Sequence, residues 1–113
     1  MITIYHNPAC RKSRETLKLI TDSGAKVEVV EYIKKPLTRV ELSEILQKLE
    51  MEPEELVRKG EAIFKDKFKG KEFSKDDWLK IMIEYPKLME RPIVVKKDQA
   101  IIGRPPENVL KLL

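Results

Sequence analysis

The chain has 113 residues, a length that suits one folded domain around a single hydrophobic core. Hydrophobic residues make up 42% and charged residues 37% of the sequence, a mixture that excludes a disordered polymer as the main state. No apolar run approaches the roughly 20 residues that cross a bilayer. The first residues also lack a basic region followed by an apolar stretch. We therefore expect no membrane association and a cytoplasmic location.

The 23 basic residues exceed the 19 acidic ones by only four, and most charges alternate in sign along the chain. So small a surplus does not predict a nucleic-acid partner. The stretch from Lys65 to Lys71 is locally basic and could meet an anionic partner, but we interpret it as a solvated loop. The single cysteine, Cys10, excludes an intrachain disulfide and a cysteine-only metal site. We expect no metal, and a reducing compartment suits a lone thiol.

The first third of the chain predicts a strand, a helix and a second strand. Residues 2–5 are rich in β-branched and aromatic side chains, as strands are. Asn7-Pro8 then predicts a turn, and residues 11–23 a helix that ends before Gly24. The valines from Val27 to Val30, with Tyr32, predict the second strand.

The middle of the chain predicts helices, and its end predicts a hairpin and a last helix. Thr38 and Glu41 form a capping box that opens one helix. Pro53 opens a shorter helix through Leu56 and Val57, and Ser74 caps another that ends or is kinked at Tyr85-Pro86. Residues 93–95 and 100–102 predict a hairpin with its turn at Lys97-Asp98. Residues 107–113 predict the closing helix.

The order β-α-β, then helices, then β-β-α predicts an α/β fold with a mixed sheet. A right-handed crossover makes the first two strands parallel. We expect a single domain over residues 1–113, with residues 37–90 as a helical insertion.

Cys10 lies where the first strand gives way to the first helix. The unpaired N–H groups and the dipole of a helix N-terminus stabilise an anion there. His6 and Ser13 lie on the same loop and first turn, and Arg11 adds positive potential. These are the conditions that lower the pKa of a thiol. A small buried core cysteine is the alternative, and the strand–loop–helix position favours a reactive thiol.

Residues 10–13 form a C-x-x-S pattern in the place where thioredoxin-like folds carry C-x-x-C. Such folds keep a cis peptide bond before the strand that faces this loop, so we expect Arg91-Pro92 to be cis. A plain turn proline is the alternative, since only about 5–6% of X-Pro bonds in folded proteins are cis.

Four blocks of the sequence resemble, in order and spacing, the glutaredoxin-coupled arsenate reductase family, which also contains the Spx-type transcription regulators. The blocks are YHNPACRKSRETL, LVRKGE, RPIVV and GRPPENVLKLL, and the resemblance covers essentially the whole chain. It implies a thioredoxin-like fold with an inserted helical segment.

The resemblance implies a role for each matching residue. Cys10 matches the nucleophile, and His6 and Ser13 match the residues that tune it. The three oxyanion-binding arginines match Arg58, Arg91 and Arg104. Guanidinium forks pair with oxyanion oxygens bidentately, which suits a tetrahedral anion.

The activity so implied is reduction of arsenate to arsenite through a covalent Cys10 adduct. The chain would bind no cofactor, use glutathione as a co-substrate and glutaredoxin as a partner, and act as a monomer. Two alternatives stay open. One is a non-catalytic Spx-like regulatory module that binds RNA polymerase. The other is a glutathione-dependent thiol-disulfide oxidoreductase that acts on mixed disulfides.

Overall fold

The computed structural model describes residues 1–113, which divide into two compact units. The sheet unit comprises residues 1–35 and 91–113, and the helical unit comprises residues 36–90. No helix in either unit is long and apolar enough to cross a membrane.

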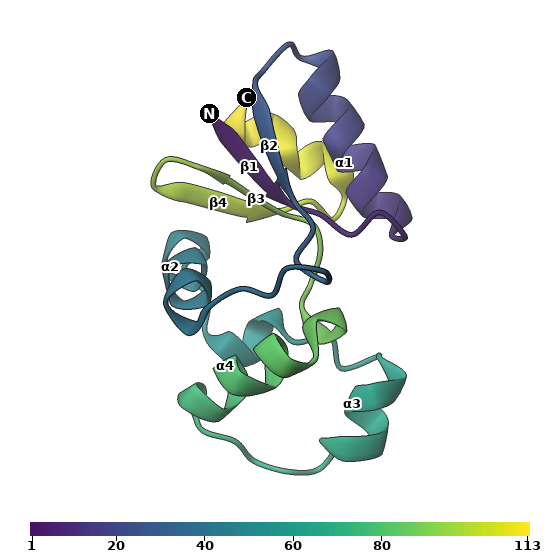
Figure 1. The fold of residues 1–113 in the computed structure, drawn as a ribbon, viewed down its shortest axis with the longest axis vertical. Coiled ribbons are helices and arrows are strands. Elements are labelled where there is room, and N and C mark those ends of the chain that lie inside the picture. Colours follow the sequence, from purple (N-terminus) through teal and green to yellow (C-terminus); the bar gives the residue numbers. More distant parts are fainter. The chain divides into compact units, whose positions relative to one another are not determined.

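The sheet unit contains one mixed sheet of four strands in the order β2-β1-β3-β4 (Figure 1). Strand β1 (Ile2–Tyr5) pairs in parallel with β2 (Val27–Val30), as the predicted crossover requires. On its other side β1 pairs antiparallel with β3 (Ile93–Lys96), which forms a hairpin with β4 (Gln99–Ile102). The predicted α/β class and mixed sheet are therefore confirmed.

The strand register brings several chain segments to one end of the sheet. Tyr5 is paired with Val30 in β2 and with Ile93 in β3, and Ile93 is paired with Ile102 in β4. The residues that follow β1, β2 and β4, and those that precede β3, therefore leave the sheet together. These residues are His6, Glu31, Gly103 and Pro92. Every sequence-predicted site residue of the sheet unit lies at or beyond this end.

One face of the sheet is covered by α1 (Arg11–Asp22) and η3 (Pro106–Leu112), which pack against each other (Figure 1). Their buried side chains meet those of β1 and β3 in one apolar core, made of Ile2, Ile4, Ile20, Val94, Val109 and Leu112. Burying a side chain of this size contributes roughly 1.5–3 kcal/mol. This core fixes α1, and hence the loop before it, against the sheet.

The helical unit contains α2 (Arg39–Leu49), η1 (Pro53–Leu56), α3 (Ala62–Lys67), α4 (Lys75–Glu84) and η2 (Pro86–Leu88). Thr38 caps α2 and Ser74 caps α4, each in a complete capping box. Helix α4 packs against α2, η1 and η2. Its buried face is built from Trp78, Leu79, Ile81 and Met82.

Some predicted elements differ from the observed ones. The helix predicted after Pro53 is a 3-10 helix, and Val57 is extended because it pairs with Met89. The solvated loop predicted from Lys65 to Lys71 is wrong in its first part. Helix α3 includes Lys65 to Lys67 because Phe64, within it, is buried and stacks on the Trp78 ring, with 6.3 Å between centroids.

Two further boundaries change in the sheet unit. Strand β2 ends at Val30, and Tyr32 is buried in the turn that follows. The closing helix is a 3-10 helix that begins at Pro106 and ends at Leu112. Prolines cannot donate a backbone N–H, so they suit the first turn of a helix, where that group has no partner.

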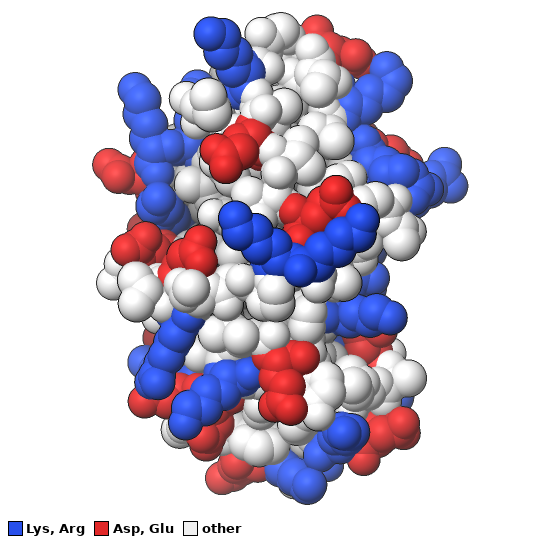
Figure 2. Space-filling view, viewed as in Figure 1, with Lys and Arg blue, Asp and Glu red and all other residues white.

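Positive and negative side chains are interspersed over the visible face of the molecule (Figure 2). This mixture agrees with the small net charge of +4. Salt bridges between residues close in sequence account for part of this mixture, such as Arg11 with Glu15 and Lys18 with Asp22 on α1. Exposed pairs of this kind contribute about 0–1 kcal/mol each, so the surface charge does little to hold the fold together.

Candidate active site

Cys10 is the N-cap residue of α1, at the end of a tight loop. Its backbone is extended, with φ −95° and ψ 120°, and its carbonyl accepts the first helical hydrogen bond from the Arg14 N–H at 3.1 Å. The Cys10 N–H donates to the Asn7 carbonyl at 2.9 Å, and the Ala9 N–H donates to the Asn7 side-chain oxygen at 3.0 Å. The Asn7-Pro8 turn thus delivers the thiol to the helix N-terminus, as the sequence indicates.

The half-buried Cys10 sulfur faces three hydrogen-bond donors. Burial by itself raises the pKa of the Cys10 thiol. The Ser13 N–H, the Arg91 guanidinium and the Lys12 N–H act in the opposite direction and outweigh burial, so the pKa lies below that of an ordinary thiol. The Cys10 side chain makes no short cap hydrogen bond to the first turn of α1. These donors therefore act mainly on the charged form, which attracts them more strongly.

His6 and Ser13 form a buried pair behind the cysteine. The His6 Nδ1 lies 2.6 Å from the Ser13 hydroxyl, which also accepts a hydrogen bond from the Asn7 N–H at 3.0 Å. Burial lowers the pKa of His6, and Arg14 lowers it further, against an opposing effect of Glu31. The neutral form of the imidazole is therefore favoured. One polar network thus links the end of β1 to the first turn of α1.

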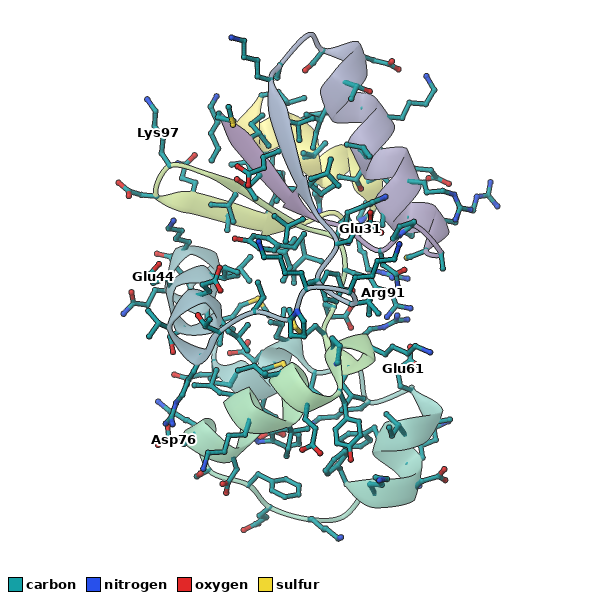
Figure 3. All side chains as sticks on the ribbon, viewed as in Figure 1. Glu31, Glu44, Glu61, Asp76, Arg91 and Lys97 are labelled. Atoms are coloured by element: carbon teal, nitrogen blue, oxygen red, sulfur yellow. The ribbon has the colours of Figure 1, made fainter.

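Arg91 and Arg104 lie at the same end of the sheet as this network. Arg91, labelled in Figure 3, immediately precedes Pro92 and β3. Its guanidinium acts on the Cys10 sulfur as a hydrogen-bond donor and through its charge. Arg104 follows β4, and the adjacent Gly103 N–H donates to the Pro92 carbonyl at 2.9 Å. The two arginines therefore flank neighbouring backbone segments joined by a hydrogen bond.

Arg58 belongs to the helical unit and not to the sheet unit that holds Cys10. Its backbone N–H donates to the Leu88 carbonyl at 2.6 Å, and its guanidinium lies 3.2 Å from the Glu61 carboxylate. The Arg58 side chain is 23% exposed. It is therefore held in place within its own unit, and its predicted part in the site stays a prediction.

The backbone around the arginines has one feature that the sequence predicts and others that it does not reveal. The Arg91-Pro92 peptide bond is cis, which confirms the prediction, and Arg104-Pro105 is also cis, which was not expected. The Asn108 side chain donates to the Arg104 carbonyl at 3.1 Å and to the Ile102 carbonyl at 3.3 Å. Thr16 is fully buried beside Gly103. Asn108 and Thr16 were missed because each acts through backbone atoms brought together by the fold.

Comparison with known proteins identifies the family of this chain. The sequence profile of the ArsC family matches residues 5–112. A mixed sheet with a cysteine at the start of α1 fits the thioredoxin-like fold of the arsenate reductases that the sequence resembles. The chain belongs to the ArsC family.

Relatives and solved structures match the chain over nearly its full length. The uncharacterized protein YfgD of Escherichia coli is 43% identical, with 99% of this chain and 96% of the relative covered. The arsenate reductase of Haemophilus influenzae is 38% identical, with 99% and 98% covered. The structure of the arsenate reductase from Vibrio cholerae is 42% identical, with a TM-score of 0.94 over 99% of this chain and 97% of that one.

The contact between Arg91 and the Cys10 sulfur leads to a first testable prediction. Replacing Arg91 by Gln removes a charged donor from the thiolate, so alkylation of Cys10 by a neutral reagent should need a higher pH than in the wild type. The matched control is Arg11→Gln, because Arg11 lies next to Cys10 in sequence but is exposed and paired with Glu15. Equal midpoints for the wild type and Arg91→Gln would contradict the assigned contact.

Proposed function

We propose that this protein is an arsenate reductase in which the Cys10 thiolate is the nucleophile. One observation carries the proposal: the only thiol of the chain lies at the N-terminus of α1, faced by two backbone N–H groups and the Arg91 guanidinium. These donors lower the pKa of the thiol and would equally attract an anionic substrate. Membership of the ArsC family and the named arsenate reductases among its relatives support the same activity.

In the first step, the Cys10 thiolate attacks the arsenic atom of arsenate. An arsenic–sulfur bond forms, and one oxygen leaves as water or hydroxide, which gives a covalent adduct. We assign Arg58, Arg91 and Arg104 as the groups that offset the charge on the remaining oxygens. The positions of Arg91 and Arg104 at the Cys10 end of the sheet support this assignment, and the family resemblance supports Arg58.

In the second step, an external thiol must complete the reduction because the chain has no second cysteine. We assign this role to glutathione, whose thiolate attacks the Cys10 sulfur. The electron pair of the arsenic–sulfur bond stays on arsenic, which leaves as arsenite. A disulfide between Cys10 and glutathione remains, and glutaredoxin reduces it by thiol–disulfide exchange.

The scheme uses side chains of one copy of the chain together with glutathione. We therefore propose that the protein acts as a monomer and requires no bound metal or organic cofactor. A lone thiol that cycles through a mixed disulfide needs a reducing compartment, so we propose the cytoplasm as its location.

The test of this function is reduction of arsenate by the purified protein with glutathione and glutaredoxin. The wild type should release arsenite over many turnovers, and Cys10→Ser should release none. Mass spectrometry of the stopped reaction should find one glutathione on the chain, attached at Cys10. Thioredoxin and its reductase should not replace glutathione, because no internal disulfide can form for thioredoxin to reduce.

Sustained turnover with thioredoxin alone would contradict the monothiol scheme. Reduction of glutathionylated peptides in the absence of any arsenate reduction would favour the mixed-disulfide oxidoreductase instead. A folded protein that turns over neither substrate would favour a regulatory binding module.

The oxyanion assignment predicts that lysine cannot replace the three arginines. Arg58→Lys, Arg91→Lys and Arg104→Lys each keep the charge but lose the planar fork that pairs with two oxygens. Losing one donor to the transition state costs roughly 3 kcal/mol, so single-turnover adduct formation should slow about a hundredfold. Arg11→Lys is the matched control, because the Arg11 side chain is 83% exposed. Unchanged rates in all three variants would show that these arginines do not bind the oxyanion.

A further inference from the structure

Thr16 is a fully buried polar residue of α1 with no role in the chemistry described so far. Its exposed fraction is 0%. Its hydroxyl lies 2.8 Å from the Lys12 carbonyl oxygen and 3.4 Å from the Gly103 carbonyl oxygen. Carbonyl oxygens only accept hydrogen bonds, so the Thr16 hydroxyl must act as a donor. The shorter distance identifies the Lys12 carbonyl as its main partner.

The Lys12 carbonyl belongs to the same peptide group as the Ser13 N–H. A peptide group is planar, so a contact that holds its carbonyl also orients its N–H. Ser13 is the third residue of α1, and the N–H at that position of a helix faces the side chain of the N-cap residue, which here is Cys10. The same N–H is among the groups that lower the pKa of the thiol. Hydrogen bonds in such a chain also polarise one another, so donation to the carbonyl strengthens donation by the N–H.

We propose that Thr16 is a positioning residue of the active site, whose hydroxyl holds the Lys12–Ser13 peptide group so that the Ser13 N–H is directed at the Cys10 sulfur. The inference rests on the proposed role of Cys10 as the nucleophile. It does not depend on arsenate as the substrate.

Close packing keeps the Thr16 side chain in this position. A Cβ atom on Gly103 would lie 2.5 Å from the Thr16 hydroxyl oxygen and 2.9 Å from the Pro92 Cγ. Distances this short leave no room for any side chain at residue 103, so glycine is required there. Gly103 precedes Arg104, and Pro92 follows Arg91. Thr16 therefore packs against the segment after β4 that carries Arg104.

The charged and titratable groups that affect Cys10 belong to residues other than Thr16. Arg91 faces the sulfur from the segment before β3. His6 reaches the same turn through the Ser13 hydroxyl, and its own titration responds to Glu31 and Arg14. Replacing Thr16 by an uncharged residue leaves all of these groups present, so a change in the titration of Cys10 reports on the peptide group.

The experiment compares three variants in the purified protein. Thr16→Val keeps the shape of the side chain but removes the hydroxyl, and Thr16→Ser keeps the hydroxyl but removes the methyl group. Thr21→Val is the matched control, because the Thr21 hydroxyl donates to the Lys18 carbonyl at 3.0 Å on the exposed face of the same helix. Thiolate absorbance is followed against pH, and alkylation of Cys10 by a neutral reagent is timed below the wild-type midpoint.

Thr16→Val should move the Cys10 midpoint to higher pH and slow alkylation about two- to fivefold, the effect of weakening one hydrogen bond. Thr16→Ser should stay close to the wild type, and Thr21→Val should equal it. The proposal is overturned if Thr16→Val titrates like the wild type, or if Thr16→Ser shifts as far as Thr16→Val, because packing and not the hydroxyl would then be responsible.

Thermal unfolding of each variant shows whether it folds. If Thr16→Val does not fold, Thr16→Ala takes its place, with the same expected shift. If neither variant folds, the hydrogen bond of Thr16 is tested in the wild type by proton exchange. A Thr16 hydroxyl proton protected from exchange with water supports the hydrogen bond to Lys12, and an unprotected one overturns it. Both thiol measurements omit arsenate, so a protein that fails to reduce arsenate still tests Thr16.

Discussion

A negative charge on the Cys10 sulfur is the feature on which the rest of the site depends. Burial alone disfavours that charge, and the Ser13 N–H, the Arg91 guanidinium and the Lys12 N–H together overcome this effect. Two of the three donors come from the first turn of α1, and the third comes from the residue before the cis proline. A small displacement of either segment would leave the sulfur half-buried without its donors, where the neutral thiol is favoured.

The sheet unit keeps these two segments together through its strand register and its core. Because Tyr5, Ile93 and Ile102 are level across β1, β3 and β4, the loop after β1 and the residues around Pro92 and Gly103 meet at one end of the sheet. The apolar core under α1 sets the height of the helix above the sheet. The polar contacts of the active site are thus secondary to apolar burial, which supplies most of the energy that positions them.

Local features of the site could be predicted from the sequence, and long-range ones could not. The position of Cys10 at a helix start follows from the Asn7-Pro8 turn. The capping box of α2 follows from Thr38 and Glu41, which lie within one helical turn. The contact of Thr16 with Gly103 joins residues 87 positions apart, and no sequence pattern marks it. Helix α3 was missed because its one deeply buried side chain, Phe64, forms no repeating pattern.

The central claim is that the ionised Cys10 thiol, stabilised by the site, is the species that attacks arsenate. The direct measurement is the single-turnover rate of Cys10 adduct formation across pH, normalised to the ionisation of free arsenate, beside the titration of the thiol in the same protein. Because a thiol loses its charge as pH falls through its pKa, the rate should fall together with the thiolate, with a shared midpoint below that of an ordinary thiol. A rate that stays constant while the thiolate disappears would contradict the account.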